Sequence, residues 1–138
     1  SEELVRPIAE TMLKMGMKRA AVVHGSGLDE VAIHGDTSVA EIKDGKIHEY
    51  ILSPEDFGVE RFPLEAIKGG VPQENKAIIT NILTGRGTDA QLGAVAVNVA
   101  LLMRLFGHED LKANTRQAIE AMNSGKAFKL VEQLAARG

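Results

Sequence analysis

The dipeptide Asp44-Gly45 constrains the fold more than any other feature, because it stands between two segments in which apolar and polar residues alternate. Asp-Gly in this setting is a strong signal for two antiparallel strands joined by a two-residue turn. With these two residues as the turn, Ile42 is predicted to pair with Ile47, and Glu41 with His48. One face of this β-hairpin is then mixed and the other mainly apolar. The residues of the apolar face are Ala40, Ile42, Ile47 and Ile51.

A helix and a short apolar strand are predicted ahead of the hairpin. The helix is expected to begin near Leu4 and to end at Gly16. Its apolar face is formed by Leu4, Ile8, Met12 and Met15. The segment from Arg19 to His24 is continuously apolar in its middle and is followed by a glycine, which is typical of a strand covered on both faces in a parallel sheet. We therefore expect an α/β fold with a partial mixed sheet.

The C-terminal half is predicted to be rich in helix. Thr88 and Gln91 have the spacing of a capping box, which predicts a long helix from Thr88 to Phe106 with Gly107 as its terminator. The residues between Leu92 and Leu105 are nearly all apolar, so we expect this helix to be buried.

Shorter elements surround the long helix. Single helical turns are predicted at Ser53 to Asp56 and near Leu64 to Lys68. A helix is also predicted from Gln73 to Thr84. Two amphipathic helices are expected at about Glu109 to Asn123 and Lys126 to Ala136.

Composition excludes several classes of function. The chain has 138 residues and a formal net charge of −3, the wrong sign for attraction to a nucleic-acid backbone, so no nucleic-acid partner is expected. It has no cysteine, which excludes disulfides, thiolate metal sites and a cysteine nucleophile, and which fits a cytoplasmic location. Its longest apolar run is far shorter than the ~20 residues that cross a bilayer, so no membrane partner is expected.

The segment from His24 to Glu30 is the best candidate for a functional site. It follows the predicted parallel strand, and open α/β sheets bind ligands at the carboxyl ends of their strands. Gly25 and Gly27 allow close approach of the backbone to a ligand. Asp29 and Glu30 supply the hard oxygen ligands that Mg²⁺ accepts, usually together with substrate phosphates. The plainer interpretation is a glycine turn with two solvated acids.

Other motifs fit their templates poorly. The same segment resembles a dinucleotide-binding fingerprint, but Glu30 stands where a small residue is needed. The segment Gly85 to Ala90 matches that fingerprint better, yet it follows a helix rather than a strand. His24, His34 and Asp36 could form a metal site, but their spacing does not favour zinc.

The residues from Ala21 to Glu30 resemble the V-x-H-G-x-x-G-L-D-E type segment of the anthranilate phosphoribosyltransferases. The likeness continues in order along the chain. The further matching segments are Pro54 to Gly58, Gly69-Gly70, Glu74 to Ile78, Leu83 to Gly87, Val97 to Ala100, and the closing Leu134 to Gly138. Residues 1–138 are therefore interpreted as the C-terminal part of the α/β domain of such an enzyme.

The resemblance implies transfer of a phosphoribosyl group from phosphoribosyl pyrophosphate to the amino group of anthranilate, a step of tryptophan biosynthesis. It implies that Asp29 and Glu30 bind Mg²⁺ associated with the pyrophosphate of the donor. His24 and Gly25 match the motif, with no role beyond shaping the end of the strand. The parent enzyme is expected to be a cytoplasmic homodimer.

Members of the family also have an N-terminal helical domain, a glycine-rich loop for the donor and a segment that helps to bind anthranilate. None of these is found in the 138 residues. We therefore expect a fragment that is inactive alone, with an unpaired sheet edge and uncovered apolar surface that cause association.

Two alternatives remain open. The chain could be part of an enzyme related to the pyrimidine nucleoside phosphorylases, which share the broad architecture. It could also be a binding module that keeps the metal and phosphate loop without catalysing a transfer.

Overall fold

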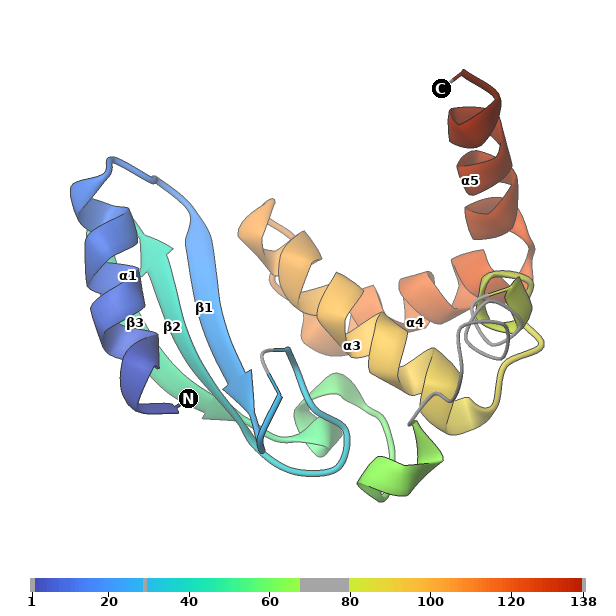
Figure 1. Cartoon of the computed structure of the whole chain (residues 1–138), viewed down its shortest axis with the longest axis horizontal. Coiled ribbons are helices and arrows are strands. Elements are labelled where there is room, and N and C mark those ends of the chain that lie inside the picture. Colours follow the sequence, from blue (N-terminus) through green and yellow to red (C-terminus); the bar gives the residue numbers. More distant parts are fainter. Residues whose placement is uncertain (1, 29, 68–79, 138) are drawn as a thin grey trace.

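The computed structural model describes residues 2–28, 30–67 and 80–137 of the chain. A three-stranded sheet lies between helix α1 on one face and helices α3 and α4 on the other, and α5 extends away from the sheet (Figure 1). The helices are α1 (Val5–Lys14), α3 (Asp89–Leu105), α4 (Leu111–Asn123) and α5 (Lys126–Arg137), and the strands are β1 (Ala20–Gly25), β2 (Thr37–Lys43) and β3 (Lys46–Leu52). The α/β class, the hairpin and the helix-rich C-terminal half are confirmed.

The hairpin β2–β3 has the predicted turn and register. Asp44 and Gly45 have φ values of 54° and 73°, the left-handed pair that is typical of a type I′ hairpin turn. Ile42 pairs with Ile47, and Glu41 with His48, as predicted. The apolar face is only partly confirmed, because Ala40 and Ile42 are buried whereas Ile51 is 67% exposed. Helix α1 covers the part of this face that contains Ala40 and Ile47.

Strand β1 differs from its prediction. It pairs with β2 in the antiparallel sense, where its apolar run predicted a parallel strand. Its faces do have apolar neighbours, since Val22 contacts the α1 cluster and Val23 contacts the main core. The prediction that both faces of this strand are covered was nevertheless wrong. β1 is an edge strand of the described sheet, and its four middle residues are only half-buried.

Helix α1 begins and ends as predicted, but its core-facing side was wrongly assigned. Val5 and Ala9 are buried against the sheet, whereas Leu4, Ile8 and Met15 are exposed. The predicted apolar stripe instead borders an open groove of about 370 Å³ between α1 and β1. This groove has an apolar lining that the described residues leave uncovered.

Helix α3 has the predicted cap and terminator. The Thr88 hydroxyl accepts a hydrogen bond from the backbone N–H of Gln91, and the Gln91 side chain accepts one from the N–H of Thr88. Gly107 follows the helix with a φ of 102°. The buried side of α3 forms the main core together with β2 and Phe57. Full burial was wrong, because three large side chains of the opposite side are exposed, namely Val99, Leu102 and Phe106.

The remaining helices agree with the sequence where they are described. Short 3-10 helices are found at Pro54–Phe57 and Leu64–Ala66, and α4 is capped by Asp110, which accepts from the N–H of Ala113. The predicted helix from Gln73 to Thr84 lies mostly outside the described residues. The part of it that the structure describes is helical at residues 80–83. Among the described residues, no helix is both long and apolar enough to cross a membrane.

Candidate functional site

The candidate loop begins at the end of β1, as its sequence predicted. Gly25 and Leu28 exchange two backbone hydrogen bonds, of 2.7 and 3.0 Å, so the chain reverses immediately after the strand. Ser26 and Gly27, at the tip of this reversal, have φ values of 46° and 100°. The left-handed backbone costs little at glycine but is uncommon at serine. The loop is therefore a tight, specific turn.

Polar contacts attach this turn to the segment that leads into β2. The ring nitrogen Nε2 of His34 donates to the carbonyl oxygen of Ser26 at 2.9 Å, and the Ser26 hydroxyl donates to the carbonyl oxygen of Asp36 at 2.9 Å. The backbone N–H of Gly27 donates to Nε2 of His24 at 3.3 Å. His24, His34 and Asp36, considered above as metal ligands, thus contribute to holding the turn.

Glu30 lies at the far end of the turn, with an exposed side chain for which no hydrogen bond or ion pair is found among the described residues. Its backbone is closely packed, because a Cβ added at Gly25 would clash with the carbonyl oxygen of Glu30 and lie 2.8 Å from the backbone nitrogen of Ala32. Only glycine fits at position 25. Asp29, the other predicted ligand, lies outside the described residues.

The three residues after Glu30 are each fixed to a different part of the fold. Val31 pairs with the side chain of Asn98, the N–H of Ala32 donates to the Thr37 hydroxyl at 3.0 Å, and the carbonyl of Ile33 accepts from the N–H of Phe62 at 2.9 Å. This segment lies in no strand, so these contacts replace the pairing of a sheet. The loop is held firmly at the carboxyl side of Glu30.

The guanidinium group of Arg61 is held by two carboxylates, one of which belongs to the segment that leads into β2. Arg61 donates from Nη2 to Oδ1 of Asp36 at 3.1 Å and from Nε to Oε1 of Glu55 at 3.4 Å. These two hydrogen bonds raise the pKa of Arg61, which therefore remains a cation. The pKa of Glu55 is lowered, first by a backbone hydrogen bond and then by Arg61. Both carboxylates are thereby engaged, in contrast to Glu30.

The Glu30 carboxylate is the kind of oxygen ligand that Mg²⁺ accepts together with phosphate oxygens. No group of three or more acidic, histidine or cysteine residues that could enclose a metal is found among residues 2–28, 30–67 and 80–137. Mg²⁺ does not need such a cage, because it keeps several waters and binds one or two carboxylates plus substrate phosphates. An exposed carboxylate on a firmly held backbone, next to a glycine turn, meets that requirement.

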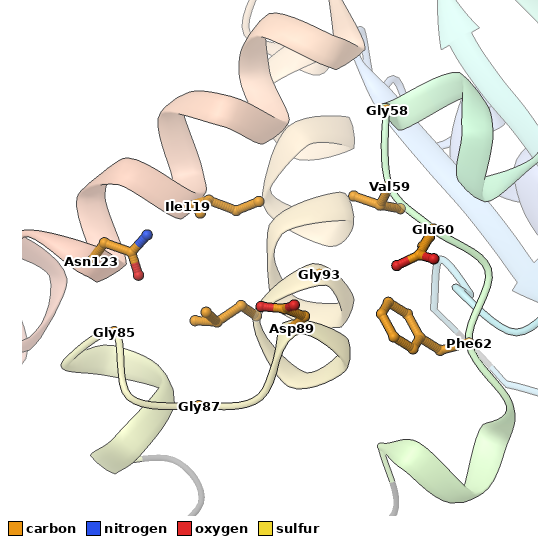
Figure 2. Close-up of a pocket in the computed structure, with 11 residues that line it drawn as sticks. Gly58, Val59, Glu60, Phe62, Gly85, Gly87, Asp89, Gly93, Ile119 and Asn123 are labelled. Carbon is orange, nitrogen blue, oxygen red and sulfur yellow. The ribbon is translucent and has the colours of Figure 1, made fainter.

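A separate cavity of about 480 Å³ lies at the N-terminal end of α3. Figure 2 shows Glu60 and Phe62 on one side of this cavity and Asn123 of α4 on the other, with Asp89 between them. Its lining includes no residue from the segment 24–34, so this cavity does not coincide with the candidate loop. Both of its carboxylates are exposed, and neither was indicated by the sequence.

Comparison with known proteins places the chain in a family. Residues 1–128 match the model of the "Glycosyl transferase family, a/b domain". Because that match covers most of the chain, the protein belongs to this family of glycosyl transferases.

Individual relatives make the similarity more specific. The chain is 88% identical over 136 residues to an anthranilate phosphoribosyltransferase of Vibrio parahaemolyticus, covering 99% of this chain and 41% of the relative. It is 55% identical over 138 residues to the anthranilate phosphoribosyltransferase of Serratia proteamaculans, covering 100% of this chain and 42% of the relative. The resemblance predicted from the ordered motifs is confirmed. The chain spans about two-fifths of the length of these relatives.

Solved structures have the same fold over this region. The anthranilate phosphoribosyltransferase of Thermus thermophilus superposes with a TM-score of 0.87 at 36% identity, over 99% of this chain and 40% of that one. The Saccharomyces cerevisiae enzyme in complex with phosphoribosyl pyrophosphate and Mg has a TM-score of 0.84 at 30% identity, over 96% of this chain and 39% of that one. Another structure of the yeast enzyme is in complex with 4-fluoroanthranilate.

Proposed function

We propose that this chain supplies the metal-binding loop of an anthranilate phosphoribosyltransferase, with Asp29 and Glu30 as ligands of a Mg²⁺ ion bound to phosphoribosyl pyrophosphate. The observation that carries the proposal is the turn at the end of β1, where the exposed carboxylate of Glu30 stands on a backbone held at Gly25 and Val31. The complex of the yeast relative with phosphoribosyl pyrophosphate and Mg supports it.

The chemistry of the transfer explains why carboxylates suit this position. The bond between C1 of the ribose and the pyrophosphate oxygen breaks, a bond forms between C1 and the anthranilate nitrogen, and that nitrogen loses a proton. When bound, a divalent cation neutralises the negative charge that grows on the departing pyrophosphate. Glu30 would act as an electrostatic anchor, and glycine at position 25 permits the close packing that holds its backbone.

We further propose that the chain acts only together with the remaining portion of such an enzyme, which would supply the donor loop, the anthranilate site and the pairing of two copies in a cytoplasmic homodimer. The exposed edge of β1, the apolar groove beside it and the exposed side of α3 support this proposal. Exposed apolar surface that is continuous over several residues is typical of a binding interface.

A chimera tests the function. The chain replaces the matching portion of the Vibrio parahaemolyticus relative, and formation of phosphoribosyl anthranilate is followed in the presence of Mg²⁺. We expect activity from the chimera and a large loss of activity with Glu30→Gln. Glu65→Gln, a change at an exposed glutamate outside the loop, is the matched control and should have little effect.

The chain alone is assayed in parallel. We expect no product, and product formed by the 138 residues without a partner would refute the proposed dependence on further chain. Phosphorolysis of a pyrimidine nucleoside by the chimera, without transfer to anthranilate, would favour the nucleoside phosphorylase alternative. Binding of Mg²⁺ and donor with no transfer by either protein would favour the binding module.

A further inference from the structure

Asn98 is a polar residue in the middle of the apolar helix α3, and all of its hydrogen-bonding groups face the candidate loop or its own helix. Its Oδ1 accepts from the backbone N–H of Val31 at 2.8 Å. Its Nδ2 donates to the carbonyl oxygen of Val31 at 3.0 Å and to that of Ala94 at 2.9 Å. The carboxamide therefore pairs with Val31 as a neighbouring strand would.

This pairing explains why asparagine suits position 98. The bond to Ala94, one turn earlier in α3, fixes the side chain against its own helix. The second N–H and the oxygen then remain for the two backbone groups of Val31. Aspartate lacks the donors, leucine lacks every polar group, and glutamine is one methylene longer. Figure 1 shows the turn after β1 between the sheet and α3.

The consequence for Glu30 follows from the planarity of the peptide bond. The peptide that joins Glu30 to Val31 has its N–H bonded to Asn98 and its carbonyl oxygen packed against Gly25, at a distance that leaves no space for a Cβ. The N–H and the carbonyl oxygen of one rigid peptide plane are thus both held in place. Because the Cα of Glu30 lies in that plane, the point from which its side chain leaves the backbone is held as well.

We propose that Asn98 is a positioning residue that fixes the Glu30–Val31 peptide and thereby sets the affinity of the loop for a divalent cation. The inference rests on the proposed function, in which Glu30 is a metal ligand. Groups that orient metal ligands typically change metal affinity about 10- to 100-fold when they are removed. Asn98 acts through the backbone and contacts neither substrate nor metal.

The test uses Asn98→Ala, Asn98→Leu and a matched control, Asn114→Ala. Asn114 is a buried amide on α4 that donates to the carbonyl oxygens of Ala100 and His108, at 3.1 and 2.6 Å, and no hydrogen bond from it to the described residues of the loop is found. Loss of Asn114 should lower stability as loss of Asn98 does, without releasing Val31. Asn98→Leu fills the space that alanine leaves empty, in case the smaller side chain prevents folding.

The first measurement needs no metal. Amide hydrogen exchange at Val31, compared with that of the β2 amides, is expected to accelerate about tenfold or more in both Asn98 variants and to be unchanged in Asn114→Ala. Unchanged relative exchange at Val31 in the Asn98 variants would overturn the inference.

The second measurement is the affinity for Mn²⁺, used as a paramagnetic substitute for Mg²⁺, in the presence of inorganic pyrophosphate. We expect Asn98→Ala and Glu30→Gln each to weaken binding about tenfold, and Asn114→Ala to leave it unchanged. Weakening by Glu30→Gln but not by either Asn98 variant would overturn the role of Asn98 and leave the metal site intact. Failure of the unsubstituted chain to bind Mn²⁺, or no effect of Glu30→Gln, would overturn the metal site and this inference with it.

Discussion

The phenol of Tyr50 on β3 donates a 2.6 Å hydrogen bond to Oε1 of Glu41 on β2, a glutamate that is only 5% exposed. The second oxygen of this carboxylate accepts from Nη2 of Arg19 at 3.0 Å. Arg19 also donates to the carbonyl oxygen of Arg104 near the end of α3. The sheet and α3 are thus joined by a partly buried polar network as well as by the apolar core.

Tyr50 is expected to ionise at unusually high pH. Burial, followed by the hydrogen bond to Glu41, raises the pKa of Tyr50 to about 12, compared with about 10 for an unperturbed tyrosine. The chain has one tyrosine and no tryptophan, so the ultraviolet band of the phenolate reports this residue alone. A folded-state midpoint near that of a free tyrosine would contradict the prediction.

The same pKa shift predicts how stability depends on pH. The folded state favours the neutral phenol, so its contribution is complete below pH about 10 and is lost as the pH rises toward about 12. Urea unfolding across this range should show a loss of stability that is smaller in Tyr50→Phe. An equal loss in the two proteins would assign the pH dependence to other groups.

Removal of Arg19 is expected to destabilise the fold. Arg19→Ala leaves the carboxylate of Glu41 buried without its cation, and we expect a loss of about 2 kcal/mol, because a hydrogen bond to a charged group contributes about 1.5–3 kcal/mol and the Arg19 side chain retains some exposure. Arg6→Ala is the matched control, since Arg6 forms ion pairs with Glu10 and Glu49 that are half-exposed. Equal urea midpoints for the two variants would refute a special contribution of the buried pair.

A single methyl group should disturb the candidate loop. In Gly25→Ala the new Cβ would clash with the carbonyl of Glu30, so we expect lower stability and weaker Mn²⁺ binding. The matched control is Gly93→Ala in α3, where an added Cβ meets no atom of the described residues within 4 Å. That change should instead stabilise the helix by about 0.5–1 kcal/mol. Unchanged Mn²⁺ affinity in Gly25→Ala would show that the carboxylate does not depend on this close approach.

The chain by itself is expected to associate through its exposed apolar surface. Leu102 on α3 and Phe106 at its C-cap are 53% and 78% exposed, and the groove beside β1 is also apolar. Sedimentation velocity should show concentration-dependent association, and Leu102→Gln combined with Phe106→Gln should reduce it. A monomer at all concentrations, before any substitution, would contradict the prediction.

Local signals predicted the parts of the fold that depend on neighbouring residues. The Asp44-Gly45 turn fixes the hairpin register, because Asp-Gly favours the left-handed pair of a type I′ turn, which closes a two-residue loop. Thr88, Gln91 and Gly107 place both ends of α3, because each satisfies or terminates backbone hydrogen bonds within one turn of its own position. The glycine loop before Glu30 could also be located from residues close together in the sequence. Asp29, its other predicted metal ligand, lies outside the described residues.

The faces of the elements could not be assigned in this way. Three residues with the hydrophobicity of core residues are exposed, namely Leu4 just before α1, Ile8 on α1 and Leu102 on α3. Hydrophobicity gives the preference of a side chain for burial, whereas burial itself depends on which surfaces are present to cover it. Glu41 gives the opposite case, since a charged residue predicted on a mixed face is buried because Arg19 and Tyr50 pair with it.

The sequence by itself therefore determined the turns, the helix ends, the place of the acidic loop and the family, because each depends on short motifs of residues that are close together along the chain. Only the tertiary structure decided that β1 pairs with β2 in the antiparallel sense and that Asn98 meets Val31, 67 residues away. An asparagine in an apolar helix signals that it needs a polar partner. Which backbone provides that partner depends on how the helix packs, and the packing comes from contacts that no local pattern encodes.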